Sequence, residues 1–583
     1  MGPVNDTTSI AVSRPDAANG HDQAPMVEAQ HLEAGRPTQM LNPAATDDSD
    51  AHQFDDQAQR LPFARMTAAY ICLCFCYFIS YLDMNSITTS TAVISDALEA
   101  GPSITWVGTA YLLGQTSCQP LYGRVSDIVG RKPVLLFSVG CIAFGGLLGG
   151  FAQNPQWLYL CRAISGTGSG GISSSVAIIV SDLVSLKSRG KYQGLISLAI
   201  GIGASTGPFV AAGLLATGPD GWRWAFRVPS IGAAGCCCLL IFFLPQKPVY
   251  GDWRAKVSKV DWLGVVTSVA GLVLLLIPIN SGGSLWSWTN VKTISTITVG
   301  AVLLITFVAV EAYMARTPII PLQLFRRRSP AILFITGILY DFVWQTTQYF
   351  VPLYFQTVRG YTPLQSATLI LPFLLAQGLA GAASGPVMAR LARYTNVLRI
   401  GFLLWTLGAG LKLLFNQGTS TAVCAVVLAI EGAGVGWVHQ PGLVAQQANS
   451  RDQDRAVVTS TRNVLRSLGG VLGVAVSTAA YYAVLDRNLR GKVPDSLRTQ
   501  VLSGTWRLGD RTTEVYQPAI LDARMNGFKF VFAISVPLMA LCLLAVFFVD
   551  DLELQGDAKP EPQPGTQPEP QPDAPQHREK VQA

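Results

Sequence analysis

The chain has 583 residues, of which 50% are hydrophobic and only 13% are charged. Soluble proteins carry about 25% charged residues, so this composition excludes an ordinary soluble protein and indicates a polytopic membrane protein. The net charge of +6 is modest, and the cations fall in short loops, so it does not indicate a nucleic-acid partner.

The two ends of the chain are polar. Residues 1–60 lack the apolar core of a signal peptide and predict a disordered cytoplasmic tail. Residues 551–583 predict a flexible Pro-rich cytoplasmic tail. The eleven Cys lie mostly in apolar runs, and neither they nor the five His have the spacing of a metal site. We therefore expect no metal and no cofactor.

Fourteen segments between these tails are long and apolar enough to cross a bilayer. They cover residues 66–91, 104–122, 134–151, 157–180, 193–216, 226–244, 261–279, 293–313, 331–357, 364–388, 397–415, 421–447, 457–484 and 527–549. The sequence thus predicts an all-α polytopic membrane protein with 14 transmembrane helices, in two six-helix halves with an extra central pair. We expect the halves over 61–245 and 329–550, the pair over 246–328, and an outer loop over 485–525.

The positive charges predict the orientation. Lys and Arg gather in the loops on the side of the two tails, whereas the opposite short loops hold few cations: Arg223, Arg227, Lys292, Arg359 and Lys412. Because cytoplasmic loops carry the excess of Lys and Arg, both termini are expected in the cytoplasm. A plasma membrane is the expected location, with a vacuolar membrane as the alternative.

A short charged loop joins the second and third segments. Its key residues are Gly123, Asp127, Gly130, Arg131 and Lys132. The spacing Gly-x-x-x-Asp-x-x-Gly-Arg-Lys in this position closely resembles a signature of the major facilitator superfamily of transporters. Val125 and Ile128 depart from that signature. The resemblance implies a gating loop on the cytoplasmic side; the alternative is a solvated loop without a role in gating.

Ionisable residues inside the segments are costly in lipid and are therefore candidates for function. Four stand out as candidates for proton coupling: Asp83, Arg162, Asp341 and Glu431. Asp83 resembles an acidic position in the first helix of the fourteen-span drug:proton antiporter branch, and Arg162 resembles the fourth-helix Arg motif of the superfamily, to which proton coupling is assigned. Asp341 and Glu431 could carry a proton or face a cationic substrate. The alternatives are hydration near the headgroups for Asp83, an outward-reaching side chain for Arg162, and hydrogen-bonded buried acids for the other two. His439 is a weaker candidate.

The fifth segment carries a second pattern, formed by Gly201, Gly203, Gly207, Pro208 and Gly213. It resembles the helix motif of antiporters in the superfamily, although Ala211 and Ala212 depart from it. Residues 166–171 also match Gly-x-Gly-x-x-Gly, but they lie in an apolar helix with no strand before it. We interpret them as packing residues.

The resemblance covers residues 66–550, including Arg466 and the glycines that follow it, and is strongest to fungal members. It implies a proton-coupled antiporter that exports small amphipathic organic compounds such as drugs, toxins or secondary metabolites. The proton is the coupling ion, the bilayer is the surrounding partner, and a monomer is expected. The alternatives are a proton-coupled importer of an iron chelate or amino acid, and a non-transporting membrane sensor. No motif of an enzyme or an ATP-driven pump is present in the sequence.

Overall fold

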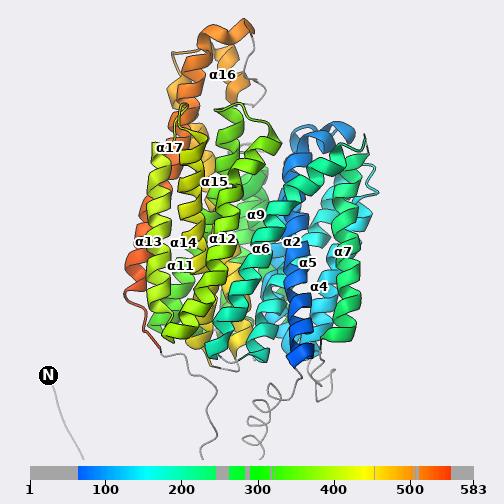
Figure 1. Cartoon of the computed structure of the whole chain (residues 1–583). Helices are drawn as coiled ribbons and strands as arrows, with labels where there is room; N and C mark the ends of the chain where they lie inside the picture. The colour runs from blue at the N-terminus through cyan, green and yellow to red at the C-terminus, as the bar shows by residue number, and fades with distance from the viewer. Residues whose placement is uncertain are drawn as a thin grey trace, which may run out of the picture. The chain divides into compact units, whose positions relative to one another are not determined.

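The computed structural model describes residues 63–552, except for 185, 219, 245–260, 282–288, 315–317, 321, 452–453, 503–505 and 507–510. The predicted tails, apart from residues 551 and 552, therefore lie outside the described residues. The regular structure in the described ranges is helical. Its long helices are α2 (Phe63–Ala97), α3 (Trp106–Val129), α4 (Arg131–Gly149), α5 (Pro155–Leu183), α6 (Leu186–Leu215), α7 (Gly221–Phe243), α9 (Trp262–Ser281), α10 (Val291–Tyr313), α11 (Arg328–Thr357), α12 (Pro363–Leu391), α13 (Thr395–Leu411), α14 (Thr421–Ala448), α15 (Arg455–Leu489) and α17 (Gln517–Val546) (Figure 1).

Twelve of the described helices are long and apolar enough to cross a membrane. The two long helices that are not in this set are α3 and α11. Each has polar side chains buried inside the bundle, such as Gln119 of α3 and Asp341 and Thr347 of α11. These side chains lower the hydropathy of their helices without facing lipid.

Two sets of helices, α2–α7 and α11–α17, are packed in corresponding ways. In the first set α5 lies against α3 and α4, and α2 lies against α6 and α7. In the second set α14 lies against α12 and α13, while α15 lies against α11 and α17. Their largest groups of buried apolar side chains are also separate. We refer to the two sets as the amino-terminal and carboxyl-terminal halves.

Equivalent glycines make the same close helix crossing in both halves. A Cβ on Gly203 of α6 would lie 2.5 Å from the carbonyl oxygen of Phe78 in α2. A Cβ on Gly469 of α15 would lie 2.1 Å from the carbonyl oxygen of Ile338 in α11. Only glycine lets the backbones come this close. Such a repeated crossing is expected of a fold built from internal repeats.

Two seams join the halves: α6 runs along α12, and α3 runs along α15. We call the end of the bundle that holds Gly130 the motif end, and the end that carries α16 (Asp495–Leu502) the far end. At the motif end a Cβ on Gly385 of α12 would lie 2.1 Å from the carbonyl oxygen of Gly190 in α6. On the other seam a Cβ on Gly123 would lie 2.4 Å from the hydroxyl oxygen of Ser460. The halves are thus in close contact at the motif end.

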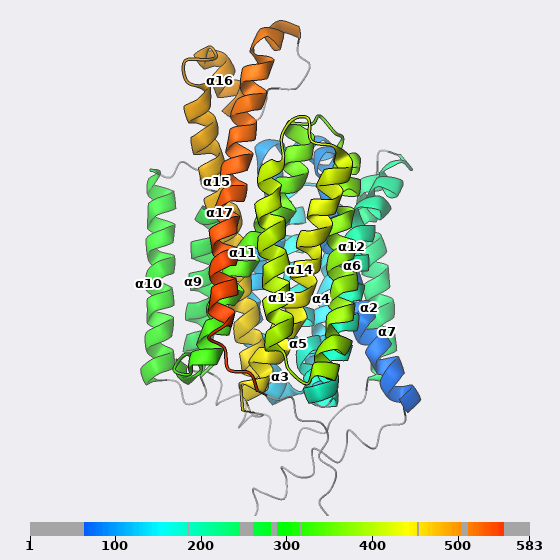
Figure 2. The ribbon, with the colours of Figure 1, turned by 60° about the vertical axis from the view of Figure 1, so that its left-hand side comes forward.

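Helices α9 and α10 pack on each other at one side of the bundle, with α10 outermost (Figure 2). Leu276 of α9 lies in one apolar cluster with Leu113 of α3 and Val471 of α15. The pair therefore lies over the seam between α3 and α15. At its motif end Glu311 accepts hydrogen bonds from the backbone N–H groups of Ile319 and Ile320, at 3.0 and 3.3 Å.

The segment expected as an outer loop over 485–525 is mostly helical where it is described. Helix α15 continues to Leu489, α16 follows, and α17 begins at Gln517 after the short 3-10 helix η5 (Arg511–Tyr516). Buried apolar side chains continue the core of the carboxyl-terminal half into this extension: Leu485, Leu489, Val493, Leu497, Val501 and Trp506. Helical structure thus fills much of the described part of the connection that was expected from the sequence as an outer loop.

Candidate functional site

An ion pair joins α2 and α5 inside the amino-terminal half. Nη1 of Arg162 lies 2.9 Å from Oδ2 of Asp83, and the two side chains are 2% and 1% exposed. Arg162 therefore does not reach the headgroups, and Asp83 is not hydrated at the surface. The sequence singled out both residues, and the fold brings them together.

Aromatic side chains and unsatisfied atoms surround this pair. The Arg162 guanidinium lies over the ring of Tyr111 at 4.4 Å and near that of Phe226 at 5.7 Å. Oδ1 of Asp83 and Nε of Arg162 are buried and have no hydrogen-bond partner in the structure. The pair is thus held by one short contact, and one carboxylate oxygen is left over. Buried polar atoms without a partner are costly and often mark a functional site.

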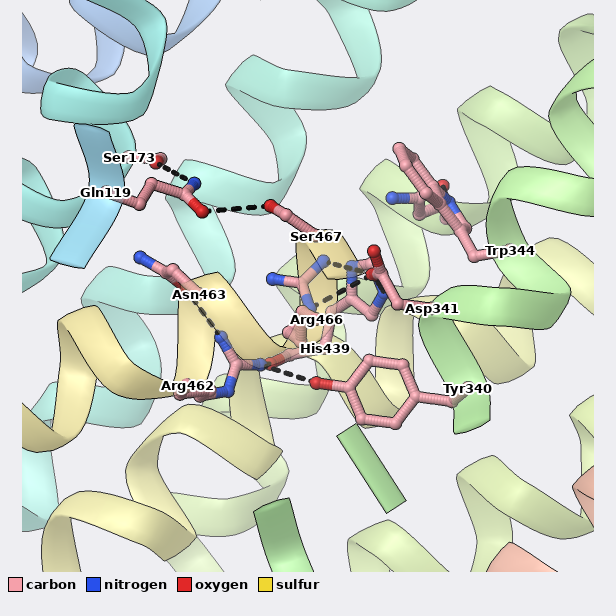
Figure 3. A network of polar contacts seen from close by, with 11 residues as sticks. Gln119, Ser173, Tyr340, Asp341, Trp344, His439, Arg462, Asn463, Arg466 and Ser467 are labelled. Carbon is pink, nitrogen blue, oxygen red and sulfur yellow. Dashed lines mark hydrogen bonds and ion pairs between the residues drawn. The ribbon is translucent and has the colours of Figure 1, made fainter. Parts of the chain in front are cut away.

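A second polar network lies where α11, α14 and α15 meet (Figure 3). Arg466 donates two hydrogen bonds to Oδ1 of Asp341, from Nε at 3.0 Å and from Nη2 at 2.7 Å. One helical turn earlier, Nη2 of Arg462 donates to the hydroxyl of Tyr340 at 2.9 Å and to the carbonyl oxygen of His439 at 2.6 Å. The predicted Asp341 is therefore already paired with a cation.

Hydrogen bonds extend this network across the seam to the amino-terminal half. Oγ of Ser467 donates to Oε1 of Gln119 at 2.9 Å, and Nδ2 of Asn463 donates to Oγ of Ser174 at 3.3 Å. Gln119 also donates to Ser173 at 3.2 Å (Figure 3). Helix α15 thus connects the charged groups of one half to polar groups of the other.

The charges in this network do not balance. Two guanidinium groups, Arg462 and Arg466, face a single carboxylate, Asp341, among the described residues. His439 lies 3.9 Å from that carboxylate through Nε2, in contact with the rings of Tyr340 and Trp344. Nε2 of His439 has no hydrogen-bond partner. No group of three or more His, Cys, Asp or Glu that could hold a metal ion occurs in the described ranges.

Glu431 forms a third buried pair, with Lys412 of the short helix η3 (Lys412–Leu414). Nζ of Lys412 lies 2.8 Å from Oε1 of Glu431 and 2.7 Å from Oγ1 of Thr347, and both charged side chains are 0% exposed. From the sequence, Lys412 was counted with the cations of the opposite short loops, at the edge of the span 397–415. The structure corrects this, because η3 turns its side chain into the carboxyl-terminal half.

The gating-loop candidates lie at the motif end, where α3 meets α4. Gly130 has φ +107°, which a residue with a side chain rarely adopts. Arg131 bridges Asp127 and Asp182, with Nε 3.0 Å from Oδ2 of the latter. Lys132 instead donates to the carbonyl oxygens of residues 241 and 244. Asp182 of α5 was not predicted, since nothing near it in the sequence points to Arg131.

The α6 pattern divides into tight and open positions. Gly201 packs on α12, and Gly203 and Gly207 pack on α2, each within 3.0 Å of a neighbouring backbone atom for an added Cβ. Pro208 lies inside the helix. Gly213 meets no atom within 4 Å. The first three glycines therefore have a packing reason that the last one lacks.

Known proteins resemble this chain in sequence and in fold. The family model described as Major Facilitator Superfamily matches residues 73–474. This chain belongs to the major facilitator superfamily. Among curated proteins it is 34% identical over 558 residues to Citrate exporter 1 of Yarrowia lipolytica, covering 95% of this chain and 80% of that protein. It is 32% identical over 425 residues to Efflux pump dotC of Dothistroma septosporum strain NZE10, covering 72% of each.

Solved structures of other major facilitator proteins share the fold. The human organic anion transporter MFSD10 superposes with a TM-score of 0.56 at 16% identity, covering 83% of this chain and all of that one. The proton:xylose symporter XylE gives a TM-score of 0.53 at 13% identity, covering 84% and 96%. The chain is thus a multi-pass membrane transporter; proteins of this superfamily are generally not enzymes.

In this major facilitator protein, the sequence alone missed Arg462 as a site residue. It noted Arg466 only as part of the family pattern. The rule that singled out Arg162, that a charge inside a span needs a partner, applies equally to them. What hid them was their position near the start of a span, where an arginine can also reach the surface.

Proposed function

We propose that this protein is a proton-coupled antiporter that exports small organic compounds, with organic anions as the preferred class. It works as a monomer in the plasma membrane, with the motif end and both termini in the cytoplasm. Helices α3 and α11 complete fourteen spans. The proton is the coupling ion, and no other cofactor takes part.

The observation that carries the proposal is the buried Asp83–Arg162 pair. With the guanidinium 2.9 Å away, the carboxylate is neutralised as an ion pair. When the halves rearrange and the two groups separate, an unpaired carboxylate in this apolar surrounding is too costly to stay charged, so it takes up a proton. Alternating separation and contact of the pair would then bind and release one proton for each transport cycle.

The substrate class follows from the surplus of positive charge around Arg462. The sequence suggested that Asp341 or Glu431 could face a cationic substrate. Each of them already has a cation, at 2.7 and 2.8 Å. Arg462 has only neutral oxygens as close partners, and a buried charge without a counter-charge is costly. An anionic group of the substrate would supply that counter-charge.

The relatives support this proposal without deciding it. A citrate exporter and an efflux pump are both similar to this chain over most of its length. Among the solved structures with the same fold is a transporter of organic anions. We assign the direction of transport as export and the substrate class as organic acids. Both assignments combine the similarity to these proteins with the uncompensated charge of Arg462.

Proton exchange for an anion is strongly driven by a membrane potential. Moving one elementary charge through 100 mV contributes about 2.3 kcal/mol. Importing one proton and exporting one monoanion moves two such charges, which contributes about 4.6 kcal/mol and supports a concentration ratio of roughly 2000. Transport should therefore carry current.

The test uses the full chain reconstituted in phosphatidylcholine vesicles with a controlled pH difference and potential. The probes are labelled citrate, a neutral compound and a cationic dye. We expect accumulation of citrate that follows the pH difference and the potential. Asp83→Asn should abolish this accumulation but keep exchange of citrate for citrate, since exchange needs no net proton movement. Asp96→Asn, an exposed position on the same helix, is the matched control.

Two results would refute parts of the proposal. Citrate accumulation that is the same without a pH difference would remove proton coupling. Transport of the cationic dye but not of citrate or other anions would refute the substrate class and favour amphipathic cations instead.

A further inference from the structure

A cavity of about 410 Å³ lies at the motif end of the seam between α6 and α12. It is lined by Ser188 and Lys191 of α6 and by Pro386, Ala389 and Arg390 of α12. One cation and a hydroxyl thus come from the amino-terminal half, and the other cation comes from the carboxyl-terminal half. Nearby, the backbones of Gly190 and Gly385 are in contact.

The other groups that the structure describes do not engage the side chains of these two cations. Among the described residues neither Lys191 nor Arg390 has an ion pair or a hydrogen bond, and both are exposed. Other cations of the same end are engaged: Arg131 binds two carboxylates, Lys132 binds two carbonyl oxygens, and Arg393 lies 3.5 Å from Asp551. An anion bound between these two side chains would offset their mutual repulsion.

The position of the cavity points to a lipid. The apolar spans of α6 and α12 cover Ser188–Leu215 and Pro363–Leu391, so the cavity lies where the apolar zone ends and headgroups begin. Four residues along α6 from Lys191, on the same helix face, Leu195 is 47% exposed. Leu379, three turns along α12 from Arg390, is 62% exposed. Apolar exposed surface therefore leads away from the cations into the membrane.

We propose that this cavity binds the phosphate headgroup of an anionic phospholipid, whose acyl chains lie along α6 and α12. Lys191 and Arg390 bind the phosphate oxygens from opposite sides, and Ser188 donates a further hydrogen bond. Basic pockets between membrane helices on the cytoplasmic side suit such headgroups. Because the headgroup touches both halves, it stabilises the closed motif end and is released when that end opens.

The test measures binding directly and does not depend on transport. Purified full-length protein in detergent is titrated with short-chain phosphatidic acid, with phosphatidylcholine of the same chain length, and with inorganic phosphate. Bound lipid is counted by native mass spectrometry, and the unfolding midpoint is followed in parallel. We expect phosphatidic acid to bind and to raise the midpoint, while phosphatidylcholine and inorganic phosphate have little effect.

Two single variants and a control locate the site. Lys191→Gln and Arg390→Gln should each weaken phosphatidic acid binding by about tenfold, the change expected from one lost charge-assisted hydrogen bond. Arg393→Gln removes a charge from the same end outside the cavity and should bind as the parent does. All three positions are exposed, so the variants should unfold at the parent's midpoint without lipid.

Each other outcome overturns a stated part. Equal stabilisation by inorganic phosphate would make the occupant a soluble phosphate and refute the lipid. Weaker binding in only one of the two variants would place the headgroup on one half and refute the bridge. Parent-like binding in both variants, or equal loss in Arg393→Gln, would refute the site.

Discussion

The pair formed by Lys412 and Glu431 should act as a structural tie and not as a proton carrier. Both side chains are fully buried. The Lys412 ammonium donates a hydrogen bond to Oγ1 of Thr347 at 2.7 Å and lies 2.8 Å from Oε1 of Glu431. Removing one partner of such a pair leaves a buried charge alone and costs about 3–5 kcal/mol. Replacing both partners by uncharged residues of similar size is often neutral.

A double-mutant cycle can test this, because the expected change in the unfolding midpoint differs between the single variants and the double variant. Lys412→Met alone should lower the unfolding midpoint of the purified protein by about 6–20 °C, taking about 2–4 °C per kcal/mol for a bundle of 150–250 residues. Glu431→Gln alone should lower it by a similar amount. The double variant should recover most of the loss, because no unpaired charge remains.

The transport assay separates structure from coupling. If the pair is structural, the recovered double variant accumulates the probe with the same dependence on the pH difference as the parent. The reasoning fails if the double variant is as unstable as the single ones, since the loss would then not come from an unpaired charge. A stable double variant that no longer responds to the pH difference would return Glu431 to the proton path.

Three further changes test other parts of the structure. Gly203→Val should lower the unfolding midpoint, since overpacking costs about 1–3 kcal/mol, whereas Gly213→Val should leave it near the parent because nothing lies within 4 Å of an added Cβ. Arg462→Gln should reduce citrate transport at least about tenfold without loss of stability; an unchanged rate would contradict its role as an anion site. Trp506→Ala should make the far-end extension easier to cut with a protease, because Arg524 lies over that ring at 4.8 Å and such a contact contributes about 0.5–2 kcal/mol. Mass spectrometry of the fragments reads the last result, and cleavage at the parent's rate would contradict it.

Local chemistry was enough to predict the long helices and several of the charges that are buried among them. Long apolar runs predict spans because every backbone polar group must be satisfied within the lipid. Asp83 and Arg162 stood out because a charge inside such a run is expensive. The charged turn between α3 and α4 was visible because Gly130 and its cations form a short pattern in one stretch of sequence.

Other features depended on contacts between distant parts of the chain. The segment over 485–525 was expected as a loop, because its few apolar side chains become buried only when α15 and α17 lie side by side. Lys412 was counted with the loop cations because it lies at the edge of a predicted span, and only the turn of η3 directs its side chain inward. Asp182 was missed because its partner Arg131 is 51 residues earlier.

By itself, the sequence determined that this chain folds as membrane-spanning helices with a few charges buried among them, because hydropathy and the cost of burying charge are properties of each segment. The tertiary structure alone decided which charges meet. Asp83 and Arg162 are 79 residues apart, and Asp341 and Arg466 are 125 apart. Their pairing depends on how each helix is rotated and packed against its neighbours, and the glycine crossings of α6 and α15 set that packing. The same packing left Arg462 without a counter-charge and brought Lys191 and Arg390 to one cavity.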